Sequence, residues 1–82
     1  MNITLKDGRT LIGTPLQIVK QMRSLAFTDP EQTLGQYIDW VAENALRFDD
    51  IALNVTGETD EQRADSLVQE MLRAGLARST AK

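Results

Sequence analysis

The first residues of the chain read MNITLKDGRTLIGTPLQ, from Met1 to Gln17, and this stretch decides the fold class. Apolar and polar residues alternate on both sides of Asp7-Gly8, a dipeptide typical of the two-residue type I′ turn of a β-hairpin. In that hairpin Ile3 faces Ile12, and Leu11 points away from the apolar face. Because an isolated hairpin is only marginally stable in water, we expect it to dock on the helices that follow.

Three helices are predicted because one capping pattern occurs three times. Thr14, Asp29 and Thr59 can each accept a hydrogen bond from a backbone amide, and each is followed three residues later by a glutamine that can bond back to the cap. The predicted helices cover residues 15–27, 30–48 and 60–74. Thr33, with Gln36 three residues further on, is an alternative cap that would begin the second helix later.

A third strand is predicted over residues 51–56, where Ile51, Leu53 and Val55 alternate with small or polar residues. Gly75 stands where a left-handed C-cap would end the last helix. Residues 77–82 are predicted to be a frayed tail, which leaves residues 1–76 as a single domain.

Together these elements predict a small α+β fold in the order β-β-α-α-β-α. Its three-stranded sheet combines the N-terminal hairpin with one later strand, and the three helices lie on one face of that sheet. We leave open which hairpin strand the third strand joins.

Composition excludes several kinds of chemistry. The 82 residues include no cysteine and no histidine, so neither a disulfide framework nor a zinc site of cysteines and histidines can form. The serines have no histidine to activate them, no glycine-rich phosphate loop is present, and the acidic residues do not match a calcium-binding loop. We therefore expect no enzymatic activity, no cofactor, no metal and no membrane segment, and a cytoplasmic location.

Trp40 is the main candidate for binding a partner. It lies off the apolar stripe of the second helix, on the side that carries Asn44 and Arg47, and a large aromatic residue on a polar flank is a common interface anchor. The alternative is that another element covers Trp40. Leu11 is the second candidate, as an exposed contact on an edge strand; its alternatives are a different hairpin register or simple packing at the base of the hairpin. The leading hypothesis is a non-enzymatic module that binds a protein partner or a second copy of itself.

Nucleic-acid binding is the alternative function. It depends on four basic residues of the hairpin and the first helix: Lys6, Arg9, Lys20 and Arg23. Basic side chains supply most of the affinity for phosphate backbones. Against this hypothesis, the chain has a net charge of −3, and no aromatic residues are interleaved with the four cations.

Overall fold

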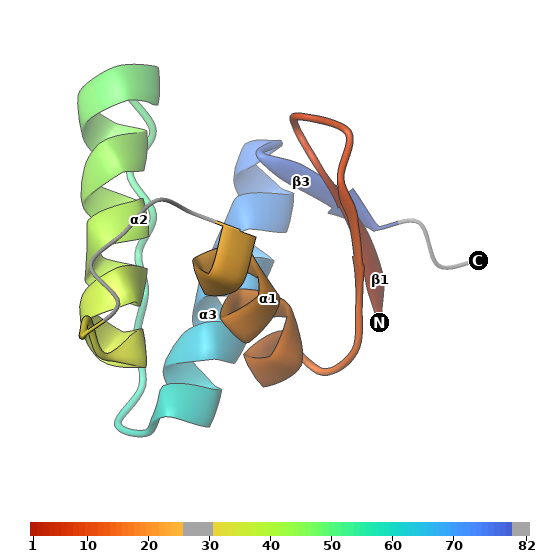
Figure 1. Ribbon diagram of the computed structural model, residues 1–82. Coiled ribbons are helices and arrows are strands. Elements are labelled where there is room, and N and C mark those ends of the chain that lie inside the picture. The colour runs from red at the N-terminus through yellow and green to blue at the C-terminus, as the bar shows by residue number, and fades with distance from the viewer. Residues whose placement is uncertain (26–30, 80–82) are drawn as a thin grey trace.

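The computed structural model describes residues 1–25 and 31–79, in which three helices pack on one side of a three-stranded antiparallel sheet (Figure 1). The elements are β1 (Asn2–Leu5), β2 (Thr10–Ile12), α1 (Pro15–Leu25), α2 (Leu34–Asp49), α3 (Asp60–Ala74) and β3 (Ala77–Ser79). The α+β class, the three-stranded sheet and the N-terminal hairpin are confirmed. Among the helices and strands of the described residues, α1 and α3 contact strands, whereas α2 contacts only the other two helices and forms an outer layer.

The hairpin register differs by one residue from the prediction. Ile3 pairs with Leu11 instead of Ile12, because the loop has three residues. The amide of Gly8 donates to the carbonyl of Leu5 at 2.9 Å, and Gly8 has a φ of 95°. This geometry is that of a turn followed by a left-handed glycine, which is common in three-residue hairpin loops. A shift of one residue exchanges the two faces of a strand, so Leu11 is buried and Ile12 is exposed.

The third strand comes from a different segment than predicted. It is β3, at Ala77–Ser79, which follows the last helix and pairs with β1 to give the order β2-β1-β3. The prediction of a frayed tail is therefore wrong for these three residues, and residues 80–82 lie outside the described part of the chain. Gly75, in the left-handed conformation, reverses the chain after α3, and the amide of Lys6 donates to the carbonyl of Leu76 at 3.1 Å.

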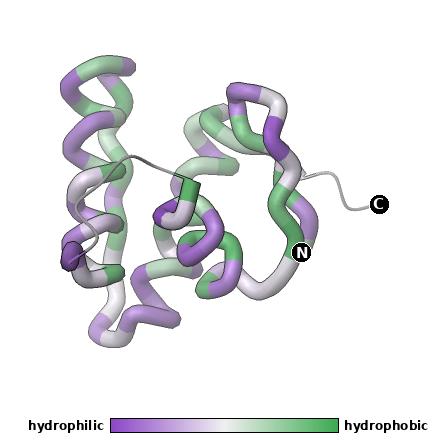
Figure 2. The backbone as a smooth tube through the Cα atoms, in the orientation of Figure 1, coloured by the Kyte–Doolittle hydropathy of each residue, from purple (hydrophilic) through white to green (hydrophobic). Residues whose placement is uncertain are grey.

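Residues 51–57, predicted to contain a strand, belong to no sheet and run alongside α2 (Figures 1 and 2). The alternation of the prediction is nevertheless present, because Leu53 and Val55 are partly buried against the core while Asn54 and Thr56 are exposed. This segment therefore has the side-chain pattern of a half-buried strand without a neighbouring strand.

Side chains of α3 take the place of that missing strand. Their oxygens accept from backbone amides at 2.9 Å in three pairs: Gln62 with Glu58, Ser66 with Thr56, and Glu70 with Asn54. Four residues along a helix rise about 6 Å, and two residues along an extended chain span about 6.6 Å. Because the two spacings nearly match, one face of α3 can hold every second amide of this segment.

The helix boundaries follow the predicted caps closely. Thr14 and Gln17 form a capping box, and Thr59 begins α3. The second helix begins at Leu34 with Thr33 as its cap and Gln36 completing the box, so the later of the two predicted starts is correct. The predicted Asp29 cap and the predicted end of the first helix at residues 26–27 lie outside the described residues.

The core lies between the sheet and the helices. Its fully buried large side chains come from β1 and all three helices: Ile3, Ile18, Val19, Ile38, Leu67 and Val68. Burying an aliphatic side chain of this size contributes about 1.5–3 kcal/mol. Apart from Tyr37, the residues that are buried in the described part of the chain are all apolar, so this interior is a packing core.

Candidate functional site: an aromatic row on the outer helix

The outer helix α2 holds Trp40 in a defined position while leaving it accessible. Its ring stacks on Tyr37, with centroids 5.9 Å apart and 28° between the ring planes. Tyr37 is 3% exposed and belongs to the core, whereas Trp40 is 40% exposed. The alternative that another element covers Trp40 is therefore wrong for the described residues. The stack favours one position of the indole on the surface, which lowers the side-chain entropy that binding would cost.

Phe48, eight residues after Trp40 on α2, is 74% exposed; at about 100° per residue it lies about 80° further round the helix than Trp40. Its spacing from Leu34 would place it near the apolar stripe that faces the core, yet it is not covered. It stands in the last turn of α2, next to Asp49, where the helix extends past the core. Two acidic residues, Asp49 and Asp50, follow Phe48 and end the helix. This feature of the sequence could have indicated that Phe48 is exposed.

Asn44 lies midway between these two aromatic residues. The positions 40, 44 and 48 are four residues apart, so their side chains form one row on the helix surface, about 12 Å long. Asn44 is half-buried. We call Trp40, Asn44 and Phe48 the aromatic row.

A charged pair flanks the row. The guanidinium of Arg47 donates to the carboxylate of Glu43 at 3.1 Å, and both side chains are mostly exposed. An exposed pair of this kind contributes little to folding stability. Arg47 is thus positioned beside Trp40 and Asn44, as predicted, and its charge is balanced by a neighbour on the same helix.

The other flank of α2 is attached to α3. Arg63 forms an ion pair with Asp39, and a Cβ added at Gly35 would lie 3.0 Å from the guanidinium of Arg63. The absence of a side chain at position 35 therefore makes room for Arg63. These contacts hold α2 against α3 and leave the aromatic row on the accessible side.

Leu11 is not part of an accessible surface. It is 5% exposed and packs in the core beside Ile3. The interpretation of Leu11 as an exposed edge contact depended on the wrong hairpin register, so we do not include it in the candidate site.

The four basic residues of the alternative hypothesis have different surroundings. Arg9, in the hairpin, forms an ion pair with Asp7 at 3.3 Å. Arg23, on α1, donates to the carbonyl of Gln32 at 3.3 Å. Lys6 and Lys20 lie on the hairpin loop and on α1. Two of the four cations thus already have partners within the chain.

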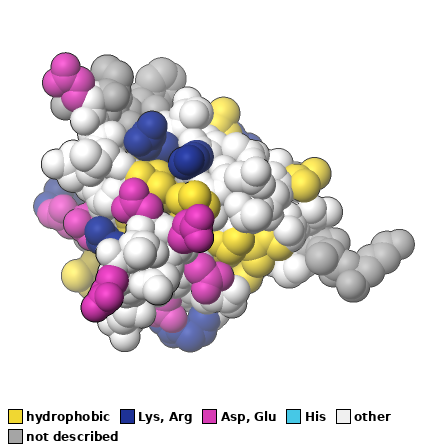
Figure 3. Space-filling model, turned by 90° about the horizontal axis from the view of Figure 1, so that it is seen from below, with side chains coloured by type: hydrophobic (Ala, Val, Ile, Leu, Met, Phe, Trp, Pro, Cys, Tyr) yellow, Lys and Arg dark blue, Asp and Glu magenta, His cyan; other side chains and the backbone are white. Residues whose placement is uncertain are grey.

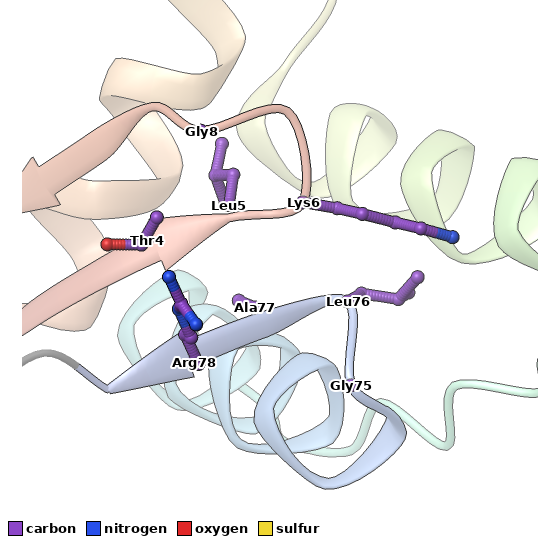
Figure 4. A pocket seen from close by; sticks show the side chains of 8 residues that line it. All are labelled: Thr4, Leu5, Lys6, Gly8, Gly75, Leu76, Ala77 and Arg78. Atoms are coloured by element: carbon purple, nitrogen blue, oxygen red, sulfur yellow. The ribbon is translucent and has the colours of Figure 1, made fainter.

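A hollow of about 340 Å³ opens between the ends of β1 and β3, with Thr4, Lys6 and Arg78 among its lining residues (Figure 4). The two cationic side chains point in different directions in this view. They do not converge on one position, as recognition of a phosphate would require.

Acidic side chains gather at the end of the molecule where α3 begins, beside hydrophobic ones (Figure 3). Glu61 and Asp65 line a hollow of about 280 Å³ there together with Pro15 and Leu16. In the described residues no three carboxylates lie close enough to hold a metal ion. Glu61 stands in the first turn of α3, where a negative charge stabilises the helix dipole.

Two perturbed acidic groups have structural explanations. Burial raises the pKa of Tyr37 to about 12. Hydrogen bonds from Arg73 and from the amide of Asn54 lower the pKa of Glu70 to about 2, and Arg73 also donates to the carbonyl of Ala52 at 3.4 Å. Tyr37 supports Trp40, and Glu70 holds the extended segment, so each shift follows from packing or folding contacts.

No protein-family model matches this chain, and the searches of curated proteins and of solved structures found no match. Among the described residues, no helix combines the length and the apolar character needed to cross a bilayer.

Proposed function

We propose that this chain is a non-enzymatic module that binds a protein partner through the aromatic row of α2. The observation that carries the proposal is Trp40, which is stacked on buried Tyr37 yet 40% exposed, about two helical turns before Phe48, which is 74% exposed. Tryptophan and tyrosine are the residues most enriched among those that dominate binding energy at protein interfaces.

The position of α2 in the fold supports this function. The helix packs on α1 and α3 with its buried side chains, including Ile38 and Ala45, and it contributes no contact to the sheet. A partner can therefore bind the outer side of α2 without disturbing the sheet. Since interface backbones usually move little on binding, the row as it stands is a fair description of the bound surface.

A photo-crosslinking residue at position 44 tests the proposal in cells that naturally make the protein. We expect discrete covalent adducts with the probe at Asn44, and none with the same probe at Gln69, an exposed position on α3. Adding Trp40→Ala to the first variant should remove the adducts. Absence of adducts at position 44, or equal yields at the two positions, would contradict a binding role for the row.

A further inference from the structure

The aromatic row has the spacing of a self-complementary surface. Asn44 lies at its centre, with Trp40 four residues before it and Phe48 four residues after it, each about 6 Å away along the helix axis. In an antiparallel pair of α2 helices with the two-fold axis at Asn44, Trp40 of each copy therefore lies level with Phe48 of the other. A two-fold interface needs this property, because one patch must fit itself.

The flanking charges are complementary in the same arrangement. An antiparallel two-fold brings the same flank of both helices together, so that Glu43 and Arg47 of one copy face Glu43 and Arg47 of the other. With the axis at Asn44, the partner's Arg47 lies level with position 41. Glu43 is two residues from that position, which is about 3 Å along the helix axis. Each arginine, now bonded to Glu43 of its own chain at 3.1 Å, can thus bridge to the carboxylate of the other copy.

The centre of the row also suits a two-fold axis. A half-buried asparagine carries both a hydrogen-bond donor and an acceptor on its side chain, so two Asn44 amides can pair with each other across the axis. Polar pairs of this kind at the centre of a helix interface favour one register over others.

We propose that the partner of the aromatic row is a second copy of this chain, bound through antiparallel α2 helices with Asn44 at the two-fold axis. This inference rests on the proposed function of the row. A patch confined to one helix of about 24 Å gives an interface at the small end of the known range, so the dimer is weak and forms reversibly.

Sedimentation from about 1 μM to about 1 mM covers the dissociation constants that a small interface gives. We expect the apparent mass to rise towards twice that of the chain, and the emission of Trp40, the single tryptophan, to shift to shorter wavelength as it is covered. Trp40→Ala and Phe48→Ala should each weaken the dimer about tenfold or more. Leu46→Ala is the matched control, because Leu46 is 56% exposed on α2 but outside the row.

Single-cysteine variants test the antiparallel register directly, since the chain has no cysteine of its own. Helices packed 8–10 Å apart bring facing Cα atoms to about 3.4–5.4 Å, which overlaps the range that a disulfide needs. We expect Asn44→Cys to oxidise to a covalent dimer at least tenfold faster than Gln69→Cys. Circular dichroism of each variant verifies that it is folded before its association is compared.

If the chain stays monomeric up to about 1 mM, the second-copy inference is wrong, because even a weak interface of this size should show association at that concentration. So would equal oxidation rates for the two cysteine variants. The cellular crosslink then separates the two proposals. Adducts at position 44 whose mass is not that of two copies keep the protein-binding function and remove self-association, whereas absence of all adducts removes both.

Discussion

The hairpin register can be tested with two adjacent substitutions. Leu11 is 5% exposed and packs in the core, whereas Ile12 is 63% exposed. In the register first expected from the sequence their roles are reversed. Leu11→Ala and Ile12→Ala thus remove similar amounts of side chain from neighbouring positions of one strand, with opposite expectations under the two registers.

The burial of each side chain sets the loss of stability that we expect from its truncation. Truncating a buried leucine to alanine costs about 2–5 kcal/mol, and the lower half of that range applies to Leu11 because its strand lies at the edge of the sheet. For a domain of this length 1 kcal/mol corresponds to about 4–8 °C in Tm, so a loss of about 2–3.5 kcal/mol in Leu11→Ala should lower the Tm by about 8–28 °C. Ile12→Ala should change stability by about 0.5 kcal/mol or less, and the backbone carbonyl of Ile12 still accepts from Gln21.

Urea unfolding followed by circular dichroism measures both free energies under the same conditions. The slope of each transition shows whether the variants unfold the same amount of surface, so that the midpoints can be compared. An Ile12→Ala variant as destabilised as Leu11→Ala, or more so, would refute the three-residue loop and restore the pairing of Ile3 with Ile12.

Two further predictions concern pH. The pKa of Glu70 is lowered to about 2 by Arg73 and the amide of Asn54, so its contribution to stability is complete above the ordinary pKa and is lost as pH falls from about 4.5 to 2. Glu70→Gln should flatten the acid limb of a Tm-against-pH curve there, and an unchanged limb would contradict the role of Glu70 in holding the extended segment. Burial raises the pKa of Tyr37, the single tyrosine, to about 12, so its contribution is present below pH 10 and lost between about 10 and 12. Tyrosinate absorbance should titrate near 12 in the folded protein and near 10 in urea; a folded midpoint near 10 would mean that Tyr37 is solvated and does not support Trp40.

The candidate site was predictable in part. Trp40 and Arg47 stand where the helical spacing placed them, on the flank of α2 and away from its buried stripe. The exposure of Phe48 was not predicted, because periodicity identifies the side of a helix but not how far the core extends along it. The burial of Leu11 was missed because the length of the turn decides which strand face points inward.

The sequence by itself determined the helices and the class of fold. Their ends follow from local hydrogen bonds, such as the box of Thr33 with Gln36 and the left-handed turn at Gly75, and residues within one helical turn of each other suffice to make these. The tertiary structure alone decided which segment became the third strand. Alternation in residues 51–56 predicts which side chains turn towards the core, but it does not show what the backbone bonds to. In this fold α3 supplies those bonds from its own side chains, and the free edge of β1 is paired by the segment that Gly75 turns back towards it.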